Sequence, residues 1–261
     1  MDLFYKLDSF YKTSNLPKGF YGYSVLKRPL YYFKVYKTEY PKIIVTYCIH
    51  AREHITTKLA LKQIKDYAKQ GKVGTVYFLP MLNPDGVKIA LTEKPLYKAN
   101  ANGVDLNVNF DARWGTGEKN VFQKGDENFI GEKPFSEPET AFLLDFTLKV
   151  KPDITLSYHC KGEEIYYEFF QPEKDRIRDF EIAKSISNVT GYQIKSTPNS
   201  AGGYKDWCIE KLRIPAITIE VGNDNLSHPL TDKHLADVYK KNKTVIKTVT
   251  EHSVWKKNLC I

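Results

Sequence analysis

The sequence predicts an α/β fold, a three-layer sandwich in which a mixed, largely parallel twisted sheet is flanked by helices. Continuous apolar segments at 42–49, 76–82, 154–160 and 216–221 are typical of strands buried on both faces. Segments with apolar residues at helical spacing lie between them, and this alternation favours parallel strands. No repeat, low-complexity tract or linker interrupts the chain, so one domain spanning residues 1–261 is expected.

The first half of the chain begins with a predicted β-hairpin at 21–37, rich in tyrosine and β-branched residues, with Arg28-Pro29 near its middle. The strand at 42–49 leads into a helix at 56–69. The strand at 76–82 ends at Asn83-Pro84-Asp85-Gly86, a strong turn signal. Residues 87–110 are expected to be mostly irregular.

In the second half, the segment Ser136-Glu137-Pro138-Glu139 predicts a helix start, with Ser136 as the cap and acids near the positive helix end. The rest of the prediction consists of a strand at 154–160, helices at 176–189 and 203–212, a strand at 216–221 and a closing helix at 231–250. In such folds, sites form at the carboxyl ends of the strands.

The charge of the chain invites a nucleic-acid interpretation, because 39 basic against 31 acidic residues give a net charge of +8. The lysines are nevertheless scattered and form no basic block. Arginine, the usual bidentate reader of guanine and of carboxylates, is scarce. We therefore expect no nucleic-acid partner, and few arginines remain to bind a substrate carboxylate. The six arginines are Arg28, Arg52, Arg113, Arg176, Arg178 and Arg213.

The sequence also bears on the cellular location of the chain. No apolar segment approaches the about 20 residues that cross a bilayer, and the N-terminal residues do not resemble a secretory signal. A cytoplasmic location is the default expectation, with export by another route left open, and a monomer is expected. The cysteines Cys48, Cys160, Cys208 and Cys260 form no C-x-x-C pair and are interpreted as buried free thiols.

The densest cluster of metal-capable groups is His50-Ala51-Arg52-Glu53-His54. An H-x-x-E-H motif on one helix, with the glutamate as base, is one interpretation. The preceding residues 44–49 are strongly strand-like, which favours a motif that starts at a strand end. There His50 and Glu53 converge across the turn while His54 begins the next helix. A third alternative is that His50 and Glu53 merely cap that helix.

A catalytic zinc ion needs three protein ligands and an open position. With His50 and Glu53 as two, the third ligand is sought at another strand end. Among the other histidines, His159 terminates a predicted buried strand, although a satisfied core histidine is the alternative there. His54 and His228 are plausible neighbours of the site.

The site also needs a base, and Glu220 ends the apolar segment Ala216-Ile217-Thr218-Ile219. A carboxylate is costly at such a position unless it is paired or functional. Near a metal it could accept a proton from water and deliver it to a leaving amine. The alternative is a carboxylate paired with a lysine at the rim of the sheet.

Taken in order, these motifs resemble the zinc metallocarboxypeptidases of the carboxypeptidase A type over roughly residues 40–225. The resemblance implies a single Zn²⁺ ion held by His50, Glu53 and His159, with Glu220 as catalytic base. It also implies that Asn107 binds substrate and that the segment 202–207 lines the specificity pocket. The matching segments are His50 to Glu53, Asn83 to Gly86, Asn102 to Asn107, Ser157 to His159, Gly202 to Trp207 and Thr218 to Glu220.

Departures from the family pattern concern the substrate. The family's exopeptidases usually have Asn-Arg where this chain has Asn107-Val108, and Val108 cannot form a charge-assisted fork with a terminal carboxylate. The family's tyrosine before the Gly-Gly pair falls near Pro198. Its oxyanion arginine is replaced by Lys98, a point charge that can still stabilise an oxyanion.

Three other basic residues are candidates for substrate contacts. Arg52 and Arg113 are the arginines best placed in sequence to reach substrate. Lys205 occupies the position that selects the side chain in the pocket, which suggests a carboxylate-bearing group; an exposed helix lysine is an equal alternative. The sequence assigns no role to Glu163, Glu164 or His228.

This combination resembles a bacterial branch, the γ-D-glutamyl-diaminopimelate peptidases acting on cell-wall peptides. The expected function is therefore hydrolysis of a peptide or isopeptide bond in a peptide or muropeptide substrate, with weak dependence on a free C-terminal carboxylate. Because the carboxylate fork is missing, a catalytically silent zinc-binding or peptide-binding module on the same fold is the alternative.

Overall fold

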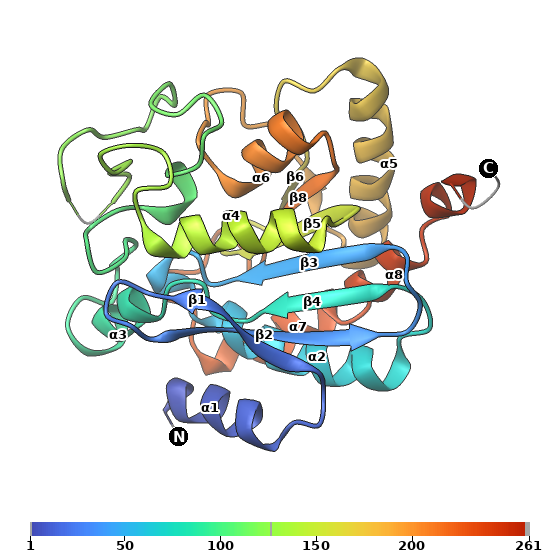
Figure 1. Cartoon of the computed structure of the whole chain (residues 1–261), viewed down its shortest axis with the longest axis horizontal. Coiled ribbons are helices and arrows are strands. Elements are labelled where there is room, and N and C mark those ends of the chain that lie inside the picture. Colours follow the sequence, from blue (N-terminus) through green and yellow to red (C-terminus); the bar gives the residue numbers. More distant parts are fainter. Residues whose placement is uncertain (1, 126, 259–261) are drawn as a thin grey trace.

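The computed structural model describes residues 2–125 and 127–258, which form one eight-stranded sheet with helices on both faces (Figure 1). The strands are β1 (Lys18–Tyr23), β2 (Pro29–Tyr36), β3 (Lys42–Tyr47), β4 (Thr75–Leu79), β5 (Ile154–His159), β6 (Glu164–Tyr166), β7 (Gln193–Ile194) and β8 (Ala216–Glu220). The helices are α1 (Leu3–Thr13), α2 (Ile55–Gln70), α3 (Pro84–Thr92), α4 (Pro138–Val150), α5 (Glu173–Thr190), α6 (Tyr204–Trp207), α7 (Leu235–Asn242) and α8 (Val245–Thr250).

The sheet is mixed, with order β1-β2-β4-β3-β5-β8-β6-β7. Its centre, β4-β3-β5-β8, is parallel, whereas β1, β2 and β4 pair antiparallel in series and β6 runs antiparallel to β8. In the parallel centre, Tyr47 lies beside Tyr158 and His159 beside Glu220. The carboxyl ends of β3, β5 and β8 therefore meet at one edge of the sheet.

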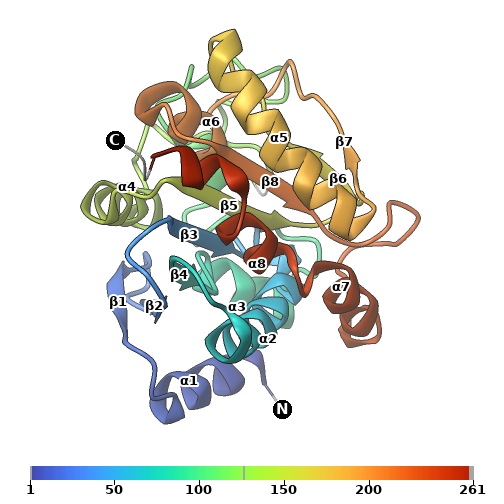
Figure 2. The ribbon, with the colours of Figure 1, turned by 90° about the vertical axis from the view of Figure 1, so that its right-hand side faces the viewer.

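Helices cover both faces of the sheet (Figure 2), and each face has its own hydrophobic cluster. Residues of α1, α2, α5, α7 and α8 pack on one face, and residues of α4 and α6 pack on the other. Along β3, Ile43 and Val45 belong to the first cluster and Ile44 to the second. Burial on both faces explains why the central strands read as continuous apolar segments.

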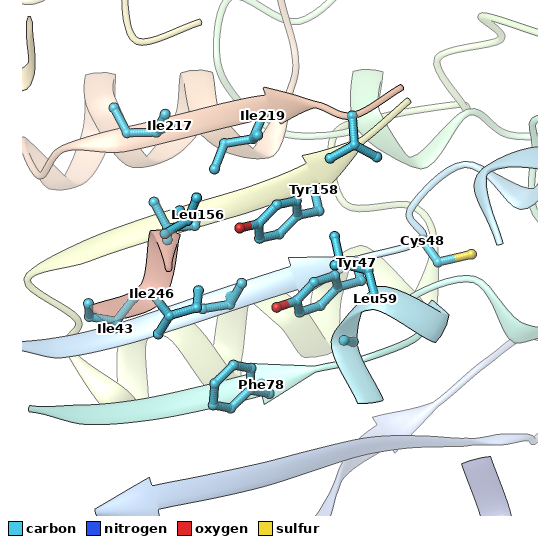
Figure 3. Packing of buried hydrophobic residues seen from close by; sticks show 14 of the residues in the cluster. Ile43, Tyr47, Cys48, Leu59, Phe78, Leu156, Tyr158, Ile217, Ile219 and Ile246 are labelled. Atoms are coloured by element: carbon cyan, nitrogen blue, oxygen red, sulfur yellow. The ribbon is translucent and has the colours of Figure 1, made fainter. Parts of the chain in front are cut away.

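Two tyrosines on the first face show how polar groups are accommodated in this core (Figure 3). The rings of Tyr47 and Tyr158 stack with centroids 5.0 Å apart. The Tyr47 hydroxyl donates to Gln63 Oε1 at 2.7 Å, and Gln63 Nε2 donates to the Tyr158 hydroxyl at 2.9 Å. The buried tyrosines therefore keep hydrogen-bond partners while their rings fill the core.

The predicted α/β architecture with a largely parallel central sheet is confirmed, and the predicted strands at 42–49, 76–82, 154–160 and 216–221 correspond to β3, β4, β5 and β8. The hairpin at 21–37 is β1 and β2, and the helices at 56–69 and 176–189 are α2 and α5. Sequence reasoning missed α1 and the short strands β6 and β7, of which β7 forms one edge of the sheet.

The expectation of an irregular segment at 87–110 was wrong in its first part, because α3 begins at Pro84. The turn signal at 83–86 is the first turn of this helix: Asn83 Oδ1 accepts the Gly86 N–H at 3.0 Å, and Pro84 occupies the start of the helix. Turn residues and helix-capping residues are largely the same types, so the pattern fitted both.

Three boundaries also differ from the prediction. Glu137, not Ser136, is the N-cap residue of α4, and Ser136 Oγ instead donates to Glu137 Oε1 at 2.9 Å. The predicted helix at 203–212 is the single turn of α6 followed by a π-helical turn at Cys208–Leu212. The predicted closing helix at 231–250 is a 3₁₀ turn followed by α7 and α8, which Lys243 and Thr244 separate.

Two smaller predictions can be compared with the described residues. None of their helices combines the length and apolar character that crossing a bilayer requires. Cys48, Cys160 and Cys208 are buried free thiols, as predicted, whereas Cys260 lies outside the described residues.

A buried carboxylate, Glu139 of α4, fastens the connection between β1 and β2 to the rest of the fold. Its Oε1 accepts the Val25 N–H at 3.1 Å, and its Oε2 accepts from Asn100 Nδ2 at 3.2 Å. Burial raises the pKa of Glu139 from 4.5 to about 7; nearby Asp85 adds to the shift and the two hydrogen bonds offset part of it.

We expect Glu139 to make the free energy of unfolding depend on pH. Because its folded pKa is raised, the folded state binds the extra proton between about pH 4.5 and 7, and stability falls as the pH rises through this range. We therefore compare the free energy of unfolding of Glu139→Gln with that of the wild type. The difference, variant minus wild type, should rise by about 3 kcal/mol as the pH is raised from 4 to 8. Urea unfolding followed by circular dichroism at several pH values measures this difference.

The matched control is Glu132→Gln, which changes an exposed carboxylate. Its free energy of unfolding over the same pH range gives the background for replacing an exposed carboxylate by an amide. A Glu139→Gln curve that runs parallel to the wild-type curve at all pH values contradicts the prediction.

Candidate active site

The site begins at the loop that follows β3, and Asn83 holds this loop in place. The Asn83 N–H donates to the Cys48 carbonyl at 3.2 Å, and its Nδ2 donates to the Ile49 and Ala99 carbonyls at 3.1 and 3.0 Å. The chain then makes a 3₁₀ turn at Ala51–Glu53, closed by the Glu53 N–H to His50 carbonyl bond at 3.1 Å. This turn brings the side chains of His50 and Glu53 to the same side.

His54 is the N-cap residue of α2, which starts at Ile55. The H-x-x-E-H segment therefore starts beyond a strand end and does not form one continuous helix. This favours the second of the three interpretations that the sequence left open.

His159 ends β5 and completes a buried group of three metal-capable side chains with His50 and Glu53. One carboxylate oxygen of Glu53 lies 2.7 Å from His50 Nδ1 and the other 3.2 Å from His159 Nδ1. The two Nδ1 atoms are 3.3 Å apart. Two nitrogens bound at about 2.0–2.1 Å to a tetrahedral zinc ion lie about 3.4 Å apart, so the spacing suits one shared ion.

The hydrogen bonding of these residues agrees with a metal site. Glu53 Oε2 is buried and has no hydrogen bond of good geometry to any residue that the structure describes. Two imidazoles and one carboxylate are a ligand set of catalytic zinc sites, in which a fourth position stays open. The residues present thus fit one Zn²⁺ ion.

Asp105 is a buried residue of the site that sequence reasoning missed. Its Oδ1 lies 3.3 Å from His50 Nε2, and its Oδ2 lies 2.7 Å from Lys98 Nζ. Burial opposes ionisation, but Lys98 and His50 hold the pKa of Asp105 well below its usual range. A carboxylate at Nε2 orients the imidazole and leaves Nδ1 free to bind a metal.

Glu220 ends β8, between His159 on β5 and Glu164 on β6 in the sheet register. Burial raises the pKa of Glu220 well above its ordinary value, and the Glu53 carboxylate raises it further. On the neighbouring strand, Glu164 accepts from the Tyr166 hydroxyl and pairs with Lys195. Glu164 is thus occupied by its own partners, whereas Glu220 faces the cavity.

A cavity of about 430 Å³ opens beside these groups, with His50, Asp105 and Glu220 in its wall. The rest of the wall is largely polar and rich in side-chain amides. It comprises Lys98, Asn107, Val108, Gly117, Glu118, Lys119, Asn120, Asn128, Tyr166, Thr197, Pro198, Asn199, Ser200 and Ala201.

Besides His50 and Glu220, two further predicted functional residues line this cavity, Lys98 and Asn107. Lys98 Nζ donates to Asn128 Oδ1 at 2.8 Å in addition to its contact with Asp105. Asn107 Oδ1 accepts the Tyr204 N–H at 3.3 Å, which ties the Asn107 side chain to the start of α6. Val108 lines the cavity beside Asn107.

The other three predicted substrate contacts are not in the cavity wall. Arg52 binds Glu127 at 2.8 Å and the Leu96 carbonyl at 3.3 Å. Arg113 pairs with Glu210 at 3.1 Å, and Lys205 contacts Asp206 at 2.6 Å. These cations have partners inside the chain, and their substrate roles stay predictions.

Comparison with known proteins agrees with this geometry. Residues 14–245 match the family model described as zinc carboxypeptidase. Murein peptide amidase A of Escherichia coli K12 is 31% identical over 214 residues, which cover 77% of this chain and 79% of that protein. Gamma-D-glutamyl-L-diamino acid endopeptidase 1 of Lysinibacillus sphaericus is 29% identical over 219 residues, covering 70% of this chain but 55% of the relative's length.

Solved structures extend the likeness to the whole fold. Bovine thrombin-activatable fibrinolysis inhibitor, in complex with a tick carboxypeptidase inhibitor, aligns with a TM-score of 0.86 at 22% identity, covering 99% of this chain and 98% of that one. Murein-tripeptide amidase of Escherichia coli O157 aligns with a TM-score of 0.65 at 22% identity, covering 90% and 94%. With the matched family model and the three converging ligands, these findings show that the chain belongs to the zinc carboxypeptidase family.

Proposed function

We propose that this chain hydrolyses a peptide or isopeptide bond in cell-wall peptides, with the γ-D-glutamyl bond to a diamino acid as the preferred target. The observation that carries the proposal is that His50 and Glu220 open onto one cavity beside the three converging ligands. The same cavity therefore offers a metal position and a carboxylate base to a single substrate.

Each residue of the site has a separate role in the proposed reaction. A zinc ion held by His50, Glu53 and His159 would supply Lewis acidity and make water more acidic. Glu220 accepts the proton of the attacking water and delivers it to the leaving amine. Lys98 places a positive charge in the wall where an oxyanion develops, and Asn107 positions the substrate.

The choice of substrate rests on two supports. The relatives from Lysinibacillus sphaericus and Escherichia coli are named for γ-D-glutamyl-L-diamino acid and murein peptide substrates. Within the chain, Val108 lines the cavity next to Asn107 and cannot form a fork with a terminal carboxylate. A substrate that does not depend on that fork suits this wall.

Purified protein is expected to cleave a peptide that contains a γ-D-glutamyl–diaminopimelate bond. A zinc chelator should abolish the cleavage, and added Zn²⁺ should restore it, because a zinc ion held by the three ligands would activate the attacking water. Chromatography with mass spectrometry of the products measures both effects. Removal of ordinary C-terminal residues one at a time, with no cleavage of blocked peptides or muropeptides, contradicts the proposed substrate.

Val108 also motivates a second function, a catalytically silent zinc-binding or peptide-binding module. The two functions predict different outcomes of the same assay. A module of this kind binds the peptide, as seen by calorimetry, and produces no cleavage whether or not zinc is supplied.

A further inference from the structure

The cations that sequence reasoning assigned to substrate are already engaged by groups of the chain. Arg52 binds Glu127, Arg113 pairs with Glu210, and Lys205 contacts Asp206. A cation held by a carboxylate has less to offer to a second one, because its charge is largely compensated.

Among the described residues, two cations line the cavity, Lys98 and Lys119. Lys98 contacts Asp105 at 2.7 Å, donates to Asn128 at 2.8 Å and already has a proposed role toward the oxyanion. Lys119 has no hydrogen bond or ion pair with any residue in 2–125 or 127–258. Its side chain is exposed, so the ammonium is open to a ligand that enters the cavity.

The backbone around Lys119 is held on both sides. Asn120 closes the turn, since its Oδ1 accepts the Gly117 N–H and its own N–H donates to the Gly117 carbonyl, both at 2.9 Å. Glu118 ties the turn to the facing loop: its N–H donates to the Asn199 carbonyl at 3.0 Å, and its Oε2 accepts from Asn199 Nδ2 at 2.8 Å.

These contacts have two consequences. The loops 117–120 and 197–201, which both contribute to the cavity wall, are joined, and Lys119 lies in a turn whose backbone is held on both sides. The Glu118 carboxylate, the acid next to Lys119 in sequence, is meanwhile occupied by Asn199.

We propose that Lys119 recognises a carboxylate of the substrate and so replaces, from the loop 117–120 of the same cavity wall, the arginine fork that is missing at Val108. The inference rests on the proposed peptidase function. The ligand is a peptide whose residue on the leaving side of the cut carries a free carboxylate. A lysine ammonium binds it as a point charge and not as a planar fork, so the position of the carboxylate along the peptide is only loosely specified.

The test compares two peptides that differ at one group, the carboxylate on the leaving residue being either free or a primary amide. For zinc-loaded Lys119→Ala, KM for the carboxylate peptide should rise about two- to fivefold, as expected for one exposed charge pair, with kcat nearly unchanged. KM for the amide peptide should not change. Lys119→Arg should restore the carboxylate preference, and Lys119→Glu should raise KM further.

A binding measurement separates recognition from turnover. In the Glu220→Gln background, calorimetry should show the carboxylate peptide binding more tightly than the amide, and Lys119→Ala should remove that difference. Lys124→Ala is the matched control, because Lys124 is an exposed lysine of the same loop that does not line the cavity. It should leave both affinities at their original values.

The outcomes distinguish the two proposals. If the wild type cleaves both peptides with equal KM, or if Lys119→Ala weakens both equally, the role of Lys119 is overturned while the peptidase function stands. If the wild type neither binds nor cleaves either peptide, both proposals are overturned.

Discussion

Glu220→Gln is expected to lose turnover by about a thousandfold or more while the chain still binds one zinc ion. A glutamine has nearly the same shape and can still accept a hydrogen bond, but it cannot take a proton from water at neutral pH. General-base catalysis typically contributes about 10²–10⁴-fold, and here the same group is proposed to serve both proton transfers. The three ligands are untouched, so metal content should stay near that of the wild type.

Two measurements check this expectation, kcat on the cell-wall peptide and zinc per chain by elemental analysis. Glu164→Gln is the matched control, because Glu164 lies beside Glu220 in the register of β6 and β8 and is occupied by Tyr166 and Lys195. Glu164→Gln should lower kcat less than about tenfold, since Glu164 neither donates nor accepts a proton in the proposed reaction. A near-normal rate in Glu220→Gln removes the base assignment.

The sheet and the metal site were predictable from sequence for the same physical reason. A strand buried on both faces carries few polar residues, so a histidine or glutamate at its end stands out. His159 and Glu220 follow such segments directly, and parallel pairing places them side by side. The H-x-x-E spacing needed only a short turn after β3 to converge, which the 3₁₀ turn supplies.

Asp105 shows where sequence reasoning stopped. It was inside the segment 102–107, but nothing in a linear pattern states that its carboxylate reaches His50, more than 50 positions earlier. The available signal was the rule that a metal-bound imidazole needs an acceptor at its other nitrogen. That rule predicts a carbonyl or carboxylate near His50 without saying which one.

Three of the four predicted substrate contacts, Arg52, Arg113 and Lys205, lie outside the cavity wall for a related reason. Whether Arg113 or Lys205 is free depends on acceptors contributed by other segments, Glu210 of the π-helical turn for Arg113 and the Glu168 carbonyl for Lys205. Such pairings depend on the packing of the connecting segments, which carry no periodic signal. Lys119, in an irregular loop, had no motif to mark it; its place in the cavity wall and its lack of a partner among residues 2–125 and 127–258 distinguish it.

His159→Ala is expected to lose the metal, and with it all measurable hydrolysis. His50 and Glu53 come from one short turn, so they can bind a metal ion only from one side. His159 reaches the site from β5, and its ring centroid lies 4.9 Å from that of His50. Substitution of a partner outside the ligand set already weakens metal binding about 10–100-fold, so loss of a direct ligand should cost more. Zinc per chain after dialysis against a weak chelator measures the effect.

Loss of zinc through unfolding is a separate possibility that two variants exclude. His159→Gln keeps most of the buried volume at the end of β5, and circular dichroism should show a native fold for it. His252→Ala removes a histidine beyond α8, far along the chain from the ligands, and should keep the full zinc content. A folded His159→Ala that retains one zinc ion per chain at wild-type affinity would mean that the ion is not shared by β3 and β5. The assignment of Glu220 as the base would then be wrong too, because Glu220 lies beside His159 and would have no metal-activated water next to it.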